Sequence, residues 1–296
     1  MFQLPSLERG LFAGMLLLSV VSAALGGVQI ARGDIRLRRL LTASVALMVS
    51  LTAAVLALRG LAIGAFPMTG VFESMLIVLL FIGLTFLLLS VVMPQVWFSS
   101  VMAWVLWMLM LLAAAVAKPA APLHEAAQTP WVIVHALSMS LAGAMIVFAA
   151  ANSILFLWSR KRLKSRHFPA LFGRMPTLET LERLTLLGLR LSLAALTAGL
   201  VSGVGLVGVK SAGLGMTVGD WLTDSKIVMI AAAWCVLLGT LLLRRWLAFG
   251  GKAVARMTLV ICFLILFAFI GSTVFCKSGH DFNRQPSTSD PLGSAL

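Results

Sequence analysis

Charged residues are scarce in this chain. Only 11% of its 296 residues are Asp, Glu, Lys or Arg, whereas 60% are hydrophobic. A soluble domain carries roughly a quarter of its residues as charged side chains, because they keep its surface hydrated. The mean hydropathy of +1.04 therefore excludes an ordinary soluble domain. Lipid is the main solvent of such a chain, and each apolar run must satisfy its backbone internally as a helix.

Cysteine is also rare, and tyrosine is absent. The three cysteines, Cys235, Cys262 and Cys276, show neither a Cys-x-x-Cys pair nor a Cys/His metal spacing. An odd, scattered set argues against a disulfide framework and favours small apolar packing residues. Ser/His/Asp elbows, P-loops, Gly-x-Gly-x-x-Gly loops and paired catalytic carboxylates are missing as well. Nothing in the residues therefore indicates a hydrolase or an NTPase.

Positive charge is the exception to this scarcity, with a net charge of +13. A nucleic-acid-binding domain would place its basic residues on one face, together with exposed stacking aromatics. Here the basic residues cluster beside apolar runs, as charges that orient a membrane protein do. The pattern predicts no nucleic-acid partner.

Eight apolar runs reach the length of about 20 residues that spans a bilayer. The runs cover residues 11–31, 41–58, 73–93, 97–117, 131–158, 186–208, 226–246 and 254–275. The shortest is 41–58, and Arg59 at its end is expected to snorkel to the interface. The sequence predicts an all-α, polytopic integral membrane bundle of about eight transmembrane helices.

Lys and Arg concentrate in alternate loops. The rich loops are 32–40, 159–185 and 244–256. The loops on the other side are nearly neutral, with Arg59 in one, Lys118 in the next, and Lys210 and Lys226 in the third. Because positive residues mark cytoplasmic loops, eight helices place all three rich loops on the inner side and both termini outside. The first run follows Glu8 and Arg9 and precedes a strong positive cluster, which favours an uncleaved helix over a signal peptide.

Two histidines are candidates for ligating a metal. His135 lies about one helical turn into the fifth run, after Pro130-Trp131, and His280 follows the eighth run. The predicted topology places both at the outer membrane surface. Imidazoles at one depth on different helices can ligate a metal ion, or a haem iron from both faces. The alternative is that each is simply a polar residue near a helix end.

The outer loop 209–226 combines glycines with Trp221 and two aspartates. One interpretation is a connector that ends in a helix N-cap at Asp224 or Ser225. The other is an amphipathic platform on which a flat aromatic ligand lies, with Trp221 stacking on it. Glycine and tryptophan at a membrane interface are compatible with both.

Glu73 lies at the outer start of the third run. A carboxylate near a helix start is stabilised by the helix macrodipole. Charge inside a membrane otherwise indicates function, so both interpretations remain open for this residue.

Several stretches of the chain resemble the cytochrome c assembly family of haem-handling membrane proteins, the CcsA/CcmC/HemX type. The matching stretches are Val71-Phe72-Glu73-Ser74-Met75, Pro130-Trp131 with His135, Leu157 to Lys164, Leu181-Glu182-x-Leu184 leading to Leu196-Thr197-x-Gly199 and Ser202-Gly203, and Phe269-x-Gly271 with His280. The resemblance covers roughly 70–296, and the first two helices match only in being apolar. It implies a division into two N-terminal helices at 1–69 and a six-helix core at 70–276. The tail 277–296 is rich in Ser, Pro, Asp and Gly, which predicts a disordered segment, and the topology places it outside.

The family's hallmark is an external segment of the form Trp-Gly-x-x-Trp-x-Trp-Asp-Pro-Lys-Glu. The corresponding stretch, Trp221-Leu222-Thr223-Asp224-Ser225-Lys226, keeps one tryptophan, the aspartate and the lysine. In the family this segment lies under haem, between two external histidines that map onto His135 and His280. The resemblance therefore implies non-covalent haem b with His135 and His280 as axial ligands, Trp221 stacked on the porphyrin, and Asp224 either starting the seventh helix or ordering the loop.

The leading functional hypothesis is a haem-binding membrane protein of cytochrome c biogenesis that handles haem at the outer face of a bacterial-type plasma membrane. Its expected partners are haem, the lipid bilayer, and apocytochrome c or another cytochrome c assembly protein. Such a protein would take part in haem–apocytochrome c ligation more as a chaperone than as a conventional enzyme. The alternatives are a small-solute transporter and a haem-free regulator that retains the family fold.

Overall fold

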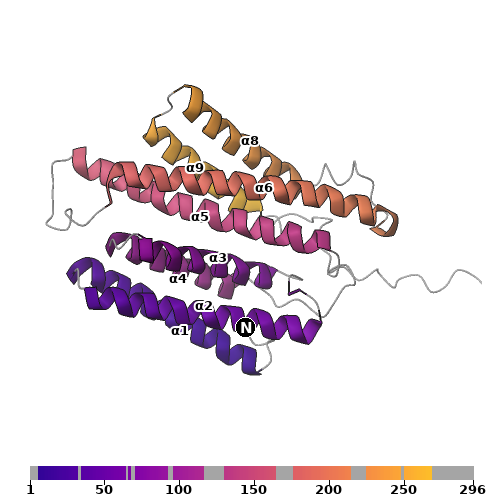
Figure 1. Ribbon diagram of the computed structural model, residues 1–296, viewed down its shortest axis with the longest axis horizontal. Helices are drawn as coiled ribbons and strands as arrows, with labels where there is room; N and C mark the ends of the chain where they lie inside the picture. Colours follow the sequence, from indigo (N-terminus) through magenta and orange to yellow (C-terminus); the bar gives the residue numbers. More distant parts are fainter. Residues whose placement is uncertain are drawn as a thin grey trace, which may run out of the picture.

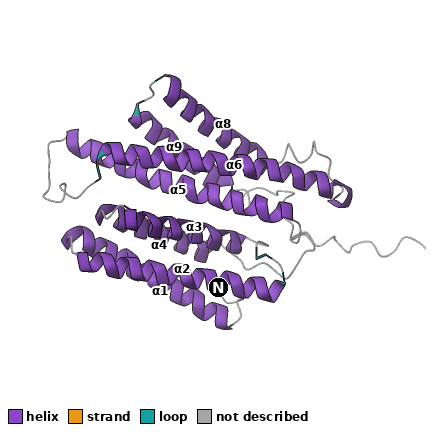
Figure 2. Ribbon diagram, in the orientation of Figure 1, coloured by secondary structure: helices purple, strands orange, loops and turns teal. Residues whose placement is uncertain are grey.

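The computed structural model describes residues 6–32, 35–64, 66–67, 71–92, 96–116, 130–164, 176–214, 225–247 and 250–268. Within these ranges the chain forms eight α-helices and no strand (Figure 2). The helices are α1 (Ser6–Arg32), α2 (Ile35–Ile63), α3 (Val71–Val92), α4 (Val96–Val116), α5 (Pro130–Lys164), α6 (Leu178–Leu214), α8 (Ser225–Trp246) and α9 (Gly251–Leu266).

Seven of the described helices are long and apolar enough to cross a membrane. The eighth, α9, has 16 residues and a length of about 24 Å at the α-helical rise. The prediction of an all-α, polytopic membrane bundle of about eight helices is confirmed. The protein is therefore an integral, multi-pass membrane protein.

Several helices are longer than the apolar runs that predicted them. The second extends over Ile35–Ile63 instead of 41–58, and α5 continues through its basic end to Lys164. Arg and Lys are good helix formers, and their long side chains reach the polar interface while the backbone stays helical. Hydropathy alone therefore underestimates these helices at their charged ends.

The helices form two groups (Figure 1). Helices α1 to α4 make one group, and α5, α6, α8 and α9 make the other, with α5 and α6 packed along each other as a long antiparallel pair. The main contact between the groups is α3 against α5. Since both helices run through the centre, the bundle is continuous across the junction.

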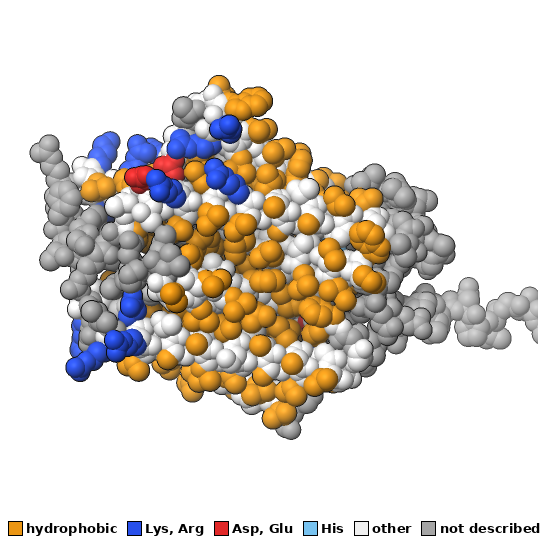
Figure 3. Space-filling model, in the orientation of Figure 1, with side chains coloured by type: hydrophobic (Ala, Val, Ile, Leu, Met, Phe, Trp, Pro, Cys, Tyr) orange, Lys and Arg blue, Asp and Glu red, His pale blue; other side chains and the backbone are white. Residues whose placement is uncertain are grey.

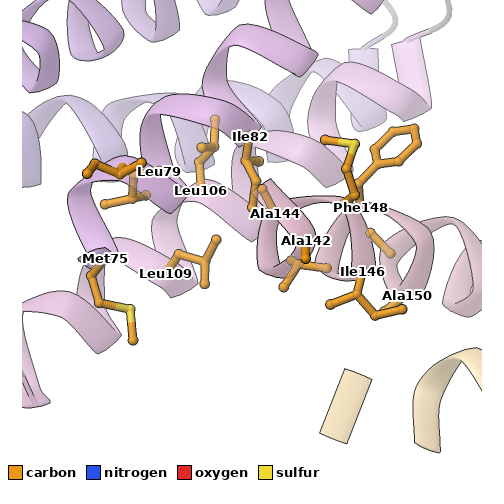
Figure 4. Packing of buried hydrophobic residues seen from close by; sticks show 14 of the residues in the cluster. Met75, Leu79, Ile82, Leu106, Leu109, Ala142, Ala144, Ile146, Phe148 and Ala150 are labelled. Carbon is orange, nitrogen blue, oxygen red and sulfur yellow. The ribbon is translucent and has the colours of Figure 1, made fainter. Parts of the chain in front are cut away.

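The buried apolar residues form one large cluster that extends through both groups. Figure 4 shows the part of it at the junction, with these labelled residues: Met75, Leu79 and Ile82 of α3, Leu106 and Leu109 of α4, and Ala142, Ala144, Ile146, Phe148 and Ala150 of α5. Phe12, Met15 and Met48 bring α1 and α2 into the same cluster. The two N-terminal helices thus pack as part of the bundle, and the predicted division at residues 69 and 70 stays a prediction.

Basic side chains gather at one end of the bundle. In Figure 3 the visible Lys and Arg side chains lie at the left end, and an apolar band covers the middle. This is the end where α1 passes to α2, α5 to α6 and α8 to α9. The arrangement agrees with the predicted orientation, in which these loops are cytoplasmic. We call this the inner end and the opposite one the outer end; the tail 277–296 lies outside the described residues.

Candidate functional site

His135 lies near the outer end of α5, in a helix that begins at Pro130. Proline suits a first helical turn, because its missing N–H has no intrahelical partner there. Trp131 is one turn before His135 and is partly exposed, as expected of a tryptophan at a membrane interface. The Pro-Trp-x-x-x-His sequence therefore places an imidazole about one turn from the start of α5, near the outer end of the bundle.

The ring of His135 is held by the neighbouring helix. Its Nδ1 lies 2.7 Å from the backbone carbonyl oxygen of Gly199 on α6. A carbonyl oxygen only accepts hydrogen bonds, so Nδ1 must carry the proton and donate it. In the neutral ring the lone pair is then on Nε2. Ligating histidines are usually oriented in this way, by a carbonyl or carboxylate on the other ring nitrogen.

Glycines on α6 allow the close approach that this hydrogen bond requires. A Cβ atom added to Gly199 would lie 2.9 Å from Sδ of Met139, and one added to Gly205 would lie 3.0 Å from the ring of Trp131. Nearer the inner end, a Cβ on Gly188 would lie 3.0 Å from the Met145 carbonyl oxygen. Small residues at a helix contact let two membrane helices pack backbone to backbone.

A second polar group at the outer end joins α1, α2 and α3. Arg59 at the end of α2 donates to Glu8 of α1 from Nε at 3.1 Å and from a terminal nitrogen at 3.0 Å. Its other terminal nitrogen bonds Glu73 in the first turn of α3. The guanidinium carbon also lies 4.9 Å from the centre of the Phe72 ring, within cation–π range.

This Glu8–Arg59–Glu73 cluster is buried. Exposure is 8% for Glu8, 7% for Arg59 and 0% for Glu73. The expectation that Arg59 snorkels to the interface is therefore wrong: two carboxylates solvate it inside the bundle better than the interface would. Gly64, with a φ of +67°, ends α2 in the left-handed conformation that glycine tolerates. The chain can thus reverse and bring Glu73 to Arg59.

The buried cluster and His135 lie at similar depths. A Cβ added to Gly143 of α5 would lie 3.9 Å from Val78 of α3, which places those two residues side by side. Glu73 is five residues outward from Val78, about 7.5 Å, and His135 is eight residues outward from Gly143, about 12 Å. Both groups therefore belong to the outer end of neighbouring helices.

A third ion pair ties the inner end together. Arg244 of α8 pairs with Glu182 of α6 at 2.5 Å. A Cβ added to Gly251, the first residue of α9, would lie 2.7 Å from the other carboxylate oxygen of Glu182. A carboxylate at a helix N-terminus is stabilised by the macrodipole. Glu182 thus links α6, α8 and α9 at the inner end of the bundle.

Only one of the predicted haem-site residues falls in the described part of the chain. His135 is described, and His280, Trp221 and Asp224 lie outside the described residues. Their roles as second axial ligand, stacking residue and loop-ordering residue stay predictions. Among the described residues, no three His, Cys, Asp or Glu side chains come together as a metal-binding group.

The fold and the outer-end residues define a multi-pass helical membrane protein with a carbonyl-oriented histidine near one end of its bundle. The family model described as Cytochrome C assembly protein matches residues 68–280 of this chain. The chain belongs to this family, which confirms the resemblance seen in the sequence. No curated protein matches the chain.

The match includes Glu73, His135, Glu182 and Gly199 but excludes Glu8 and Arg59. Sequence reasoning did not pair these last two residues with Glu73. A signal was present, because opposite charges stood at the predicted outer ends of the first three helices. The sequence could not show that these three helices are neighbours. Their adjacency depends on how they pack along their whole length.

Proposed function

We propose that this protein binds haem and presents it at the outer membrane face during cytochrome c biogenesis. Membership of the cytochrome c assembly family supports the role in cytochrome c biogenesis. The observation that carries haem binding is the Nδ1 bond of His135 to the Gly199 carbonyl. That bond orients the ring and places the lone pair on Nε2, which is what an axial ligand needs.

The described residues fit such a group. An imidazole oriented by a carbonyl is a common axial ligand of haem iron, and it stands here at the outer end of a rigid helix pair. His280 is proposed as the second axial ligand, Trp221 as the stacking residue and Asp224 as the residue that orders the outer loop. When bound, haem b supplies vinyl groups that can form thioethers with the Cys-x-x-Cys-His thiols of apocytochrome c.

The protein's own contribution is orientation. The α5–α6 pair fixes the ring of His135, and Trp131 packs on Gly205 one turn further out. A ligand held in one geometry meets its reaction partner without losing further rotational freedom. Apocytochrome c, or another assembly protein, is the proposed partner, and a bacterial-type inner membrane is the proposed location.

The test is the absorption spectrum of the full chain, purified in lipid nanodiscs after expression with ample haem. We expect the Soret and α/β bands of low-spin, bis-histidine haem. His135→Ala should weaken or abolish them, and so should His280→Ala. His167→Ala is the matched control, because His167 belongs to the predicted inner loop and should leave the spectrum unchanged.

A colourless wild-type protein under these conditions would contradict haem binding. Co-purification of an assembly protein without haem would then favour the regulator alternative. Solute uptake into proteoliposomes that survives loss of both histidines would favour the transporter alternative instead.

A further inference from the structure

Arg190 is a charged residue on the membrane-spanning part of α6, on a surface that faces lipid. It falls within the apolar run 186–208, and it is exposed. Leu187 before it and Ala194 after it, each about one helical turn away, are exposed as well. A charged side chain on such a surface is costly unless an anion or water reaches it. The position of Arg190 therefore requires a partner for its guanidinium.

Arg190 lies in the inner half of α6. Glu182 marks the inner end of this helix, where it pairs with Arg244 of α8 at 2.5 Å. Arg190 is eight residues further outward, about 12 Å along the helix. Helical side chains tilt toward the helix N-terminus, and α6 begins at the inner end, so the Arg190 side chain leans back toward the inner interface. Its apolar stem can cover the helix while the guanidinium reaches the level of the lipid headgroups.

The described helices around Arg190 offer it no counter-ion. The two carboxylates of α6 are Glu179 and Glu182, and they pair with Arg183 and Arg244. Helices α5, α8 and α9, which pack on α6, contain neither Asp nor Glu. Arg190 accordingly makes no ion pair within the part of the chain that the structure describes. The anion that neutralises it must come from outside these helices.

Arg256 of α9 has similar surroundings. It is exposed, five residues and about 7.5 Å outward from the first residue of α9. Met257 and Val260 near it are exposed by 38% and 48%. Arg245 and Lys252 are exposed nearer the inner end, where Figure 3 shows basic side chains gathered. Each Lys or Arg near a membrane surface adds to the attraction for anionic lipid.

Depth and charge together define the partner of Arg190. A dissolved anion would have to leave water for an apolar surface, which is costly. A phospholipid phosphate already lies at the headgroup level, and its acyl chains suit an apolar surface such as that of Leu187 and Ala194. Arginine binds phosphate through two parallel N–H donors, which makes the pair stronger than a single contact.

We propose that Arg190 binds the phosphate of an anionic phospholipid in the leaflet at the inner end of the bundle. The acyl chains of this lipid lie along the exposed apolar face of α6. The neighbouring exposed basic residues of α8 and α9 favour an anionic headgroup over a zwitterionic one.

Native mass spectrometry of the full chain tests the proposal, with the protein released from nanodiscs that hold equal amounts of phosphatidylglycerol and phosphatidylcholine. The wild-type protein should retain phosphatidylglycerol in preference to phosphatidylcholine. Arg190→Gln should lower the fraction of protein with bound phosphatidylglycerol about fivefold, the loss typical of one basic residue near anionic lipid. Arg190→Lys should keep most of it, because an ammonium group still binds phosphate as a point charge.

Arg183→Gln is the matched control. Arg183 lies two turns nearer the inner end on the same face of α6, and its side chain is 78% exposed, but Glu179 neutralises it. This variant should retain as much phosphatidylglycerol as the wild-type protein. An unchanged circular dichroism spectrum of Arg190→Gln shows that its fold is intact.

Equal retention of phosphatidylglycerol by the wild-type protein and Arg190→Gln would overturn the proposal. So would equal retention of the two lipids by the wild-type protein, or a loss in Arg183→Gln as large as that in Arg190→Gln. A second membrane protein that co-purifies with the wild-type chain but not with Arg190→Gln, while lipid retention stays the same, would assign Arg190 to a protein contact instead.

Discussion

At the scale of single residues, the main feature is whether each ion pair of the bundle is buried or exposed. Arg59 is enclosed by Glu8, Glu73 and the face of Phe72, whereas Arg183 pairs with Glu179 in the open. Both arginines belong to ion pairs, but the medium around them differs. Removing one member of a buried pair leaves an uncompensated charge, which is far more costly than losing an exposed pair.

We therefore expect Arg59→Met to destabilise the protein by about 3–5 kcal/mol, the cost typical of breaking a buried pair. Thermal unfolding in detergent, followed by circular dichroism, measures this effect. Arg183→Met is the matched control and should change stability by less than about 1 kcal/mol, because its side chain is 78% exposed. Equal effects of the two variants would show that the Glu8–Arg59–Glu73 cluster is solvated.

Residue roles divide sharply into those that the sequence reveals and those that it hides. His135 was identifiable because Pro-Trp-x-x-x-His fixes both its helix position and its depth. The Gly199 carbonyl that holds it was not, since a backbone acceptor on another helix leaves no mark in the residue types. Arg59 and Glu8 were visible as charges, but their pairing with Glu73 required knowledge of which helices touch.

At the scale of helices, the α5–α6 pair is the part of the structure most dependent on small residues. A Cβ added to Gly188 would lie within 3.1 Å of Ala149, the Met145 carbonyl and Phe148. By contrast, nothing lies within 4 Å of a Cβ added to Gly239 of α8. The two glycines occupy helix interiors, so they differ mainly in what surrounds them.

Gly188→Ala should destabilise the bundle by about 1–3 kcal/mol, because overpacking displaces helix backbone. Gly239→Ala should instead stabilise it by up to about 1 kcal/mol, through the higher helix propensity of alanine. Unfolding by denaturant in mixed micelles compares the two variants. A stabilising Gly188→Ala would mean that α5 and α6 are further apart than described.

Hydropathy predicts that each helix exists but not where the helix begins and ends. Apolar runs located all eight helices, since spanning lipid requires such runs. They began α2 too late and ended α5 too early, because helix propensity and snorkelling basic residues extend these helices into the interface at their charged ends. The loop sequences predicted the orientation of the bundle in the membrane but not which helices contact each other. The neighbours of each helix became known only from the structure.

At the scale of the whole molecule, the basic loops at one end of the bundle predict its orientation in the membrane. Lys161 on the inner end of α5 and Phe66 after α2 are both exposed, at opposite ends of the bundle. A membrane-impermeant thiol reagent can distinguish these ends in cells. The three native cysteines must first be replaced by serine, since Cys235 is itself exposed.

In that background, Phe66→Cys should react in intact spheroplasts, and Lys161→Cys should react only after the membrane is permeabilised. The physical reason is the cost of moving several Lys and Arg side chains across lipid during insertion. Reaction of Lys161→Cys in intact spheroplasts would reverse the orientation and place His135 on the cytoplasmic side.

The Glu8–Arg59–Glu73 cluster crosses the edge of the family region, because Glu73 lies within residues 68–280 and its two partners precede them. A chain cut down to that region would keep the carboxylate and lose its only described counter-ion, stranding an anion in hydrocarbon. Helices α1 and α2 are therefore required by the family region and are more than an added segment. Arg59 of α2 neutralises the buried carboxylate of Glu73 inside the bundle.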